Sequence, residues 1–340
     1  MNFAISKRKT LTVSQEALVQ SHLLHPAQDL PLVIEPGIGQ VDLFAWAEEN
    51  RDFIQAKLMS HGAVLFRNFS IVTVESFHLL VKKIAREALQ YKERSSPRSE
   101  VGENIYTSTD YPADQSIFPH NEHSYSLTFP LKLFFWCQIP AQLGGETPLG
   151  NTRKIYHRIP REIREEFAAK GWMFVRNFNT GFGLPWQTVF QTSDRTAVQE
   201  YCTKAGIEWE WRDGDKLRTR QVRPAIVKHP VTCEPVWFNH ATFFHITTLQ
   251  PQFVTTLRSD YAEDELPNNT FYGDGSSIPD DVIGVLREAY AQEMISFPWQ
   301  AGDVVLIDNM LTAHARAPFV GPRRILVAMA EPCDAKSLAR

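Results

Sequence analysis

The spacing of apolar and polar residues predicts a chain that begins with helices and ends with strands. From Asp42 onward, apolar positions recur at helical spacing through Leu58, and Gly62 ends the helix. The apolar run 63–67 has the length of a buried strand, and helical spacing returns over 74–89. Residues 1–38 show no sustained period, so we expect an irregular lead-in there.

Strand patterns dominate the rest of the chain. The aromatic-rich run 131–137 is a strong strand signal, and the apolar runs 302–308 and 324–329 predict strands near the end. Between them, patterns of both kinds alternate, with strands predicted at 172–176, 207–211 and 222–227, and helices at 161–170, 195–205 and 280–292. We expect an α+β fold: a double-stranded β-helix (jelly roll) with flanking helices, forming a single domain over 39–340 with a helical insert around 180–300.

Composition narrows the function classes without choosing one. The chain has 340 residues and a formal net charge of −4, so nothing indicates general attraction to nucleic acid or anionic membranes. No apolar run follows the charged N-terminus as in a secretory signal, and none is long enough to span a bilayer. The four cysteines lack CxxC spacing, which argues against a disulfide scaffold and favours the cytoplasm.

Two distant segments carry residues that suit one metal ion. His120 and Glu122 form a His-x-carboxylate pair, and alternate residues of a strand point to the same face. His314 lies just beyond the apolar run 302–308 and supplies a second imidazole. Two histidines and one carboxylate form the facial triad of non-haem iron oxygenases. Nitrogen and oxygen ligands suit Fe(II) or Mn(II), and also zinc, so these residues leave the metal open.

Three other histidines are possible ligands or supporting residues. His123 follows the first pair, and we assign it to supporting the ligands or to the structure. His240 and His245 are alternative ligands, but their aromatic, helix-like surroundings favour packed or hydrogen-bonded roles.

The order of several short motifs is more specific than any one of them. Along the chain follow Pro119-His120-Asn121-Glu122, Gly144-Gly145-Glu146-Thr147-Pro148, Asp308-Asn309-Met310, His314-Ala315-Arg316 and Gly321-Pro322-Arg323-Arg324-Ile325. In this order they resemble the taurine dioxygenase superfamily of Fe(II)- and 2-oxoglutarate-dependent dioxygenases. Within it, the chain is more similar to the branch of clavaminate synthase-like enzymes and syringomycin-type aspartyl hydroxylases. The resemblance runs from about Asp42 to Pro332.

The resemblance implies a set of ligands. His120, Glu122 and His314 would bind Fe(II), Thr147 and Arg324 would bind 2-oxoglutarate, and dioxygen would be the second co-substrate. An arginine suits the distal carboxylate because its planar fork matches a carboxylate. Neighbouring strand residues face opposite ways, so only one arginine of the pair enters the pocket. The resemblance favours Arg324 and leaves Arg323 as a surface charge; Arg316 is either a second pocket cation or part of a structural ion pair.

Two positions refine the chemistry that the resemblance implies. Taurine dioxygenase has a further arginine four positions after its 2-oxoglutarate arginine, where this chain has Ala328, so a sulfonate substrate is disfavoured. Iron halogenases of the superfamily replace the carboxylate ligand with a small residue. Glu122 is retained here, which favours hydroxylation over halogenation.

The substrate is less determined than the reaction. Candidate contacts are the polar residues Arg98, Tyr106, Ser108, Asn121 and Asn239. The resemblance implies hydroxylation of an unactivated C–H bond, at the β-carbon of an amino acid that is free or tethered to a peptidyl carrier protein, in specialised metabolite biosynthesis. Alternatives are desaturation, epimerisation or cyclisation by the same chemistry, and less favoured are a non-catalytic jelly-roll binding protein or a zinc hydrolase. The sequence leaves a homo-oligomer open.

Overall fold

The large sheet of the computed structural model is built from both ends of the chain. The structure describes residues 18–37, 39, 41–85, 87, 99–109, 111–181 and 183–339. In sheet order, the eight strands are β1 (Val19–Leu23), β2 (Leu32–Pro36), β3 (Ala63–Phe66), β17 (Val304–Asp308), β7 (Thr128–Ile139), β20 (Arg324–Asp334), β5 (Ile105–Thr107) and β4 (Glu100–Gly102).

A smaller sheet packs against the large one and carries metal-site residues. Its strand order is β16 (Met294–Ile295), β9 (Leu149–Asn151), β18 (Thr312–Arg316) and β6 (Ile117–His120). Leu149 of the small sheet shares one apolar cluster with Phe135 and Val305 of the large sheet. Two antiparallel sheets closed over such a core form the expected jelly roll.

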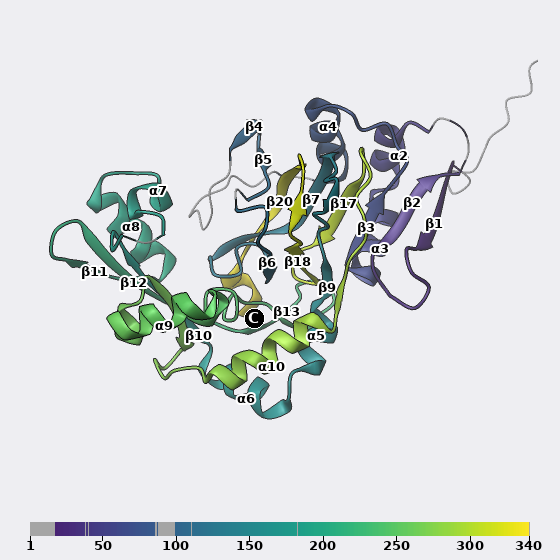
Figure 1. The fold of residues 1–340 in the computed structure, drawn as a ribbon. Coiled ribbons are helices and arrows are strands. Elements are labelled where there is room, and N and C mark those ends of the chain that lie inside the picture. Colours follow the sequence, from purple (N-terminus) through teal and green to yellow (C-terminus); the bar gives the residue numbers. More distant parts are fainter. Residues whose placement is uncertain are drawn as a thin grey trace, which may run out of the picture.

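Three helices cover the other face of the large sheet. They are α2 (Leu43–Glu49), α3 (Arg51–His61) and α4 (Val74–Ile84). The Asp42 side chain caps α2 by accepting from the backbone N–H groups of Phe44 and Ala45. Apolar residues of these helices, such as Trp46 and Phe77, pack on the strands in the largest apolar cluster. In Figure 1 these helices lie beside β3 and β17 at the right.

The insert expected around 180–300 contains helices and three of the four strands of a third sheet. That sheet has the strand order β11 (Glu208–Arg212), β12 (Lys216–Arg223), β10 (Trp172–Phe178) and β15 (Asn268–Tyr272). The helices after the first three are α5 (Thr152–Arg158), α6 (Arg161–Lys170), α7 (Trp186–Phe190), α8 (Arg195–Ala205), α9 (Pro251–Asp260) and α10 (Asp280–Ala291). Figure 1 shows α7 and α8 beside β11 and β12 at the left, with α10 and α6 at the bottom.

Short elements complete the chain. Two-stranded ribbons pair β13 (Ile226–Lys228) with β14 (Pro235–Trp237), and β19 (Phe319–Val320) with β8 (Leu143–Gly144). The 3-10 helices are η1 (Ile246–Thr248), η2 (Glu263–Glu265) and η3 (Ala335–Ala339). Within the described residues, no helix is both long and apolar enough to cross a membrane. All four cysteines are free thiols, as their spacing predicts.

The prediction of an irregular lead-in over 1–38 is wrong for the part of that segment that the structure describes. Strand β2 pairs in parallel with β3, and β1 pairs with β2, so this segment extends the large sheet. Leu32, Val33 and Ile34 are consecutive buried residues because both faces of β2 are covered. A short strand whose apolar residues are buried on both faces shows no alternation, so the apolar pattern does not reveal it.

Other boundaries differ where single residues intervene. The helix expected from Asp42 to Leu58 is broken at Asn50, whose backbone and side-chain nitrogens both donate to the carbonyl of Trp46. The strand expected over 222–227 stops at Arg223 and resumes at Ile226, because Pro224 has no N–H for the ladder. The helix expected over 74–89 ends at Ile84, with Ala85 already extended.

Candidate metal centre and co-substrate pocket

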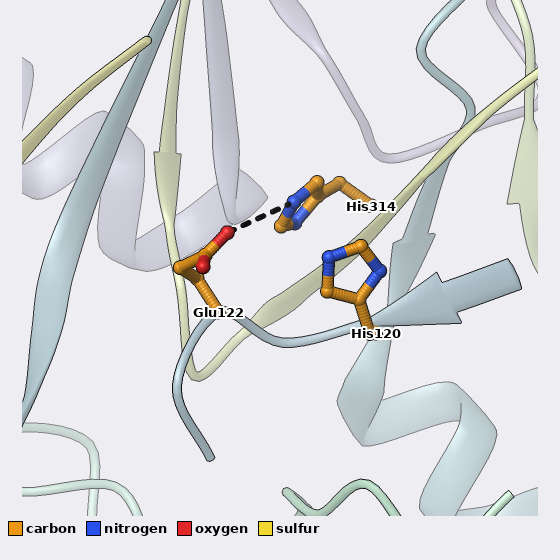
Figure 2. A group of neighbouring side chains, drawn as sticks. All are labelled: His120, Glu122 and His314. Carbon is orange, nitrogen blue, oxygen red and sulfur yellow. Dashed lines mark ion pairs between the residues drawn. The ribbon is translucent and has the colours of Figure 1, made fainter. Parts of the chain in front are cut away.

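Three side chains converge at the edge of the small sheet. One potential ligand atom from each of His120, Glu122 and His314 lies within 4.8 Å of the others. All three residues are buried, and Figure 2 shows the two rings and the carboxylate turned toward a common point. A buried carboxylate between two imidazoles is costly to leave without a cation, so this arrangement suits a divalent metal.

The two histidines come from paired strands. His120 is the last residue of β6 and pairs with His314 in β18, which brings their ring centroids within 4.3 Å. The Nδ1 of His120 lies 2.9 Å from the carbonyl oxygen of Phe118. A carbonyl only accepts, so Nδ1 carries the proton and the Nε2 lone pair remains for a metal.

Glu122 lies in a turn that follows β6, and the alternation expected of a strand does not place it. A clamp from Asn309 places it instead. The backbone N–H of Glu122 donates to Asn309 Oδ1 at 2.8 Å, and Asn309 Nδ2 donates to the carbonyls of Glu122 and Pro130. Asn121 completes the clamp by donating from Nδ2 to the carbonyl of Asn309 at 2.6 Å. The two motif segments are therefore joined by buried hydrogen bonds independent of any metal.

The turn that leads to His314 is also held by buried hydrogen bonds. Asp308 Oδ1 accepts from the backbone N–H groups of Met310 and Leu311, and its Oδ2 lies 3.1 Å from His229 Nε2. The hydroxyl of Thr312 donates to the carbonyl of Gly62 at 2.8 Å. Gly62 has a φ of 75°, and a Cβ there would lie 2.5 Å from the Thr312 Oγ1. Glycine at this position lets the end of α3 approach the ligand strand closely.

His240 and His245 occupy hydrogen-bonded positions, as expected. His240 Nδ1 lies 2.6 Å from the Ser124 hydroxyl, and its ring stacks on Phe244. Burial, and then the nearby His120, hold the pKa of His240 well below its usual range, so it is neutral. His245 caps η1 through Nδ1, and burial lowers its pKa to about 4. Within the described chain, the metal-competent cluster contains neither of them.

A cavity opens beside the two histidine ligands. Its polar wall includes Ser108, Thr147, Arg316 and Arg323, and its apolar wall includes Ile117, Phe135, Ile325 and Val327. Ligand histidines at one end and two guanidinium groups along the wall match a molecule that chelates a metal and carries a second anionic group.

The structure contradicts the placement of Arg324 in the pocket. Arg324 is exposed on the opposite face of β20, while Arg323 lines the cavity. Ile325 and Val327 line it too, so alternation along the strand puts Arg323 on their side. Only one arginine of the pair enters, as expected, but it is the first and not the second.

Arg323 is fixed at the base of the cavity. Its Nε donates to the carbonyl of Gly145 at 2.8 Å, and its two terminal nitrogens lie 3.5 Å from Ser108 Oγ and 3.4 Å from Thr147 Oγ1. Burial, and then the charge of Arg316, lower the pKa of Arg323 to about 10, so it remains a cation at neutral pH. A partly dehydrated cation held in place is a favourable partner for a carboxylate.

Thr147 reaches the cavity by way of the glycine turn before it. Gly144 and Gly145 have φ of 68° and 75°, and a Cβ on Gly144 would lie 2.3 Å from the carbonyl oxygen of Pro318. The turn places the buried Thr147 hydroxyl where Trp299 Nε1 donates to it at 3.2 Å. Thr147 therefore lies beside Arg323, as the motif order indicates.

With Arg323 as the pocket arginine, the position that corresponds to the second arginine of taurine dioxygenase is no longer Ala328. Ala328 belongs to the apolar cluster beneath helices α2, α3 and α4, on the face of β20 away from the cavity. The residue four positions after Arg323 is Val327, which lines the cavity. The place of a sulfonate-binding arginine is thus apolar in this chain, so the prediction against sulfonates still stands.

Of the candidate substrate contacts, some line the cavity and others have structural roles. Ser108 lines the cavity, but Asn121 is used in the clamp, and Asn239 donates to the carbonyl of Ala225. Tyr106 is buried in the apolar core between the sheets. Arg98 lies outside the described residues. Arg316 lines the cavity and donates to the carbonyls of Tyr111, Pro112 and Gln115, which makes it a second pocket cation.

Sequence reasoning missed two groups of residues. The clamp of Asn309 joins motif halves 187 positions apart, and no local pattern reports such a bond. The apolar wall residues Ile117 and Phe135 are ordinary strand residues by type. For Arg323 the sequence carries no such signal, because residues 325–330 are apolar at every position and buried on both faces of the strand.

Comparison with known proteins agrees with this site. Residues 26–329 match the family model described as "Taurine catabolism dioxygenase TauD, TfdA family". The chain belongs to this family. It is 41% identical over 275 residues to the dapdiamide synthesis protein DdaC of Enterobacter agglomerans, covering 81% of this chain and 84% of that protein. It is 29% identical to a clavaminate synthase-like protein of Arabidopsis thaliana, covering 90% and 94%.

Solved structures of alpha-ketoglutarate-dependent oxygenases share the fold. The Fe, alpha-ketoglutarate dependent oxygenase PvcB, from an isonitrile synthetic pathway, superposes with a TM-score of 0.55 at 15% identity, covering 98% of this chain and 97% of PvcB. Membership in the TauD family confirms the expected superfamily and the branch that the motifs indicate. The chain is accordingly a 2-oxoglutarate-dependent dioxygenase, and its His-Glu-His cluster fits the iron that such enzymes use.

Proposed function

We propose that His120, Glu122 and His314 hold Fe(II) and that 2-oxoglutarate lies in the adjoining cavity, with its distal carboxylate on Arg323. The observation that carries this proposal is the cavity itself, which joins the ligand histidines to a fixed guanidinium and to the Thr147 hydroxyl. A hydrolase built on the same three ligands would have no use for that dicarboxylate site. Arg323 thereby takes the role that the resemblance implies for Arg324.

The residues of this chain perform distinct tasks in the proposed reaction. Iron, 2-oxoglutarate and dioxygen together supply the oxidising power that attacks an unactivated C–H bond. A metal held by these three side chains would have further positions for the co-substrates. The Asn309 clamp keeps Glu122 in place, and Phe135, Ile325 and Val327 form the apolar wall of the cavity beside the ligand histidines.

We further propose that the substrate is an amino acid or a small amino-acid derivative, oxidised during the assembly of a specialised metabolite. Support comes from the 41% identity to a protein of dapdiamide synthesis. Hydroxylation is the outcome we favour, because Glu122 occupies the position that a halogenase leaves open. Presentation by a peptidyl carrier protein and formation of a homo-oligomer remain proposals. We also propose that one domain spans 19–334, since the large sheet takes strands from both ends of the chain.

A substrate screen tests the proposed activity. The iron-loaded protein is incubated with 2-oxoglutarate and air, with free amino acids and the same amino acids loaded on a carrier protein, and products are read by mass spectrometry. Addition of one oxygen atom, dependent on 2-oxoglutarate and absent in Glu122→Ala, is the expected result. Loss of two hydrogens would indicate desaturation instead. No change in any compound would contradict an amino-acid substrate.

A further inference from the structure

The indole N–H of Trp299 is bonded to a residue of the cavity wall. The Trp299 side chain is 8% exposed and belongs to the apolar cluster between the two sheets, where it packs on Phe297 with ring centroids 5.7 Å apart. Its Nε1 donates to Thr147 Oγ1 at 3.2 Å, and Thr147 lines the cavity. This hydrogen bond therefore connects the apolar core with the co-substrate end of the cavity.

An ion pair fixes the turn that carries Trp299. Arg67 donates from Nε and Nη2 to the two carboxylate oxygens of Asp303, at 3.0 and 2.6 Å. The same Nη2 donates to the carbonyl of Pro298 at 3.1 Å, and Asp303 Oδ2 accepts from the backbone N–H of Gln300 at 2.9 Å. Both chain neighbours of Trp299 are thus held by one bidentate pair, a geometry with little freedom to rotate. The indole is consequently a donor with a fixed direction.

The hydroxyl of Thr147 has few bonds left to make. A threonine oxygen has two lone pairs and one proton. Indole and guanidinium groups only donate, so Oγ1 accepts from Trp299 and from Arg323 Nη2, which lies 3.4 Å away. Both lone pairs are then used, and toward a third group the hydroxyl acts only as a donor. Within the described residues no protein group accepts that proton, so it is left for a molecule in the cavity.

We propose that Trp299 is a positioning residue that keeps the Thr147 hydroxyl turned as a donor toward the distal carboxylate of 2-oxoglutarate. This inference rests on the proposed function. The co-substrate end of the cavity then presents donors, namely the Thr147 hydroxyl and the terminal nitrogens of Arg323. A carboxylate only accepts and so satisfies them, whereas a 2-oxo acid that ends in a methyl group leaves them without an acceptor. Trp299 thereby contributes to the choice of a dicarboxylate as co-substrate.

Two 2-oxo acids separate this role from a general effect on the site. 2-Oxopentanoate has the same chain length as 2-oxoglutarate but a methyl group in place of the distal carboxylate. The affinity for each is measured anaerobically on the Fe(II)-loaded full chain, by the visible charge-transfer band. The test variants are Trp299→Phe and the replacement of Trp299 by 3-benzothienyl-alanine, which keeps the shape of the indole but has no N–H. Trp136→Phe is the matched control, because Trp136 is a buried indole that also donates at 3.2 Å, to the carbonyl of Ile71 in the cluster beneath α2, α3 and α4.

We expect each Trp299 replacement to weaken 2-oxoglutarate binding roughly 3- to 10-fold, the size of one hydrogen bond between neutral groups. Binding of 2-oxopentanoate and of iron should be unchanged, and Trp136→Phe should alter none of the three affinities. In a Thr147→Val background the hydroxyl is absent, so the Trp299 replacements should have no further effect, whereas in Thr147→Ser they should keep it.

Three results would overturn the role of Trp299. They are an equal loss of affinity for both acids, a loss that persists in Thr147→Val, and unchanged 2-oxoglutarate binding in a Trp299 variant that circular dichroism shows to be folded. A wild type that binds Fe(II) but not 2-oxoglutarate would instead overturn the proposed function.

Discussion

Arginine 323 offers the sharpest test of how the co-substrate is bound. Replacing Arg323 with alanine removes the guanidinium at the base of the cavity, whereas replacing Arg324 removes an exposed charge on the opposite face of β20. The two residues are adjacent and of the same type, so each is the other's matched control. We expect Arg323→Ala to weaken 2-oxoglutarate binding strongly and Arg324→Ala to leave it nearly unchanged.

The magnitude follows from the contacts of Arg323. Its Nε is already used by the Gly145 carbonyl, so the two terminal nitrogens are the donors left for a carboxylate. Each hydrogen bond to a charged group is worth about 1.5 to 3 kcal/mol. Two such bonds give about 3 kcal/mol or more, or a loss of roughly 100-fold or more in affinity. Removal of an exposed charge changes the free energy by about 0.5 kcal/mol or less.

The assay is an anaerobic titration of 2-oxoglutarate into the Fe(II)-loaded protein, followed by the visible charge-transfer band. Iron affinity is measured in parallel and should be largely retained in Arg323→Ala. Loss of 2-oxoglutarate binding in Arg324→Ala with retention in Arg323→Ala would refute the assignment. Equal loss of iron and 2-oxoglutarate would show that Arg323 supports the metal site instead.

Three further outcomes follow from buried groups of the structure. Asn309→Ala leaves the backbone N–H of Glu122 buried without its acceptor, so we expect a loss of about 3 kcal/mol in urea unfolding and weaker iron binding; a change below about 1 kcal/mol would count against the clamp. Gly62→Ala forces a Cβ to within 2.5 Å of Thr312 Oγ1 at a positive φ, so a loss of about 2 kcal/mol is expected, and an unchanged melting temperature would contradict it. His245, with a folded pKa of about 4, gains a proton more readily when unfolded. Stability should therefore fall as pH drops from about 6.5 toward 4, by up to about 3 kcal/mol more than in His245→Gln, and parallel pH curves for the two proteins would refute this.

The helices and strands were predictable where a long apolar pattern marks one buried face of the segment. The helix cap at Asp42, the stop at Gly62 and the strands 131–137 and 302–308 were all visible, because each combines a repeated apolar pattern with a boundary residue. Strand β2 was not visible, because a short strand buried on both faces lacks alternation. The break at Asn50 depends on a single hydrogen-bonding choice that the apolar spacing does not record.

The candidate site was predictable in its ligands and less so in their support. His120, Glu122 and His314 stood out because their residue types and motif order are specific to one kind of chemistry. The choice between Arg323 and Arg324 depended on strand register, which a motif match does not fix and the cavity-facing Ile325 and Val327 do. The clamp of Asn309 is a long-range feature, and only the folded chain reveals it.

The central claim is that one site binds Fe(II) and 2-oxoglutarate together. The most direct measurement is anaerobic addition of both to the wild type and to His120→Ala, Glu122→Ala and His314→Ala. A weak visible charge-transfer band should form in the wild type and be absent in each of the three variants. A folded wild type that binds iron without the band, or a band that persists in Glu122→Ala, would contradict the account.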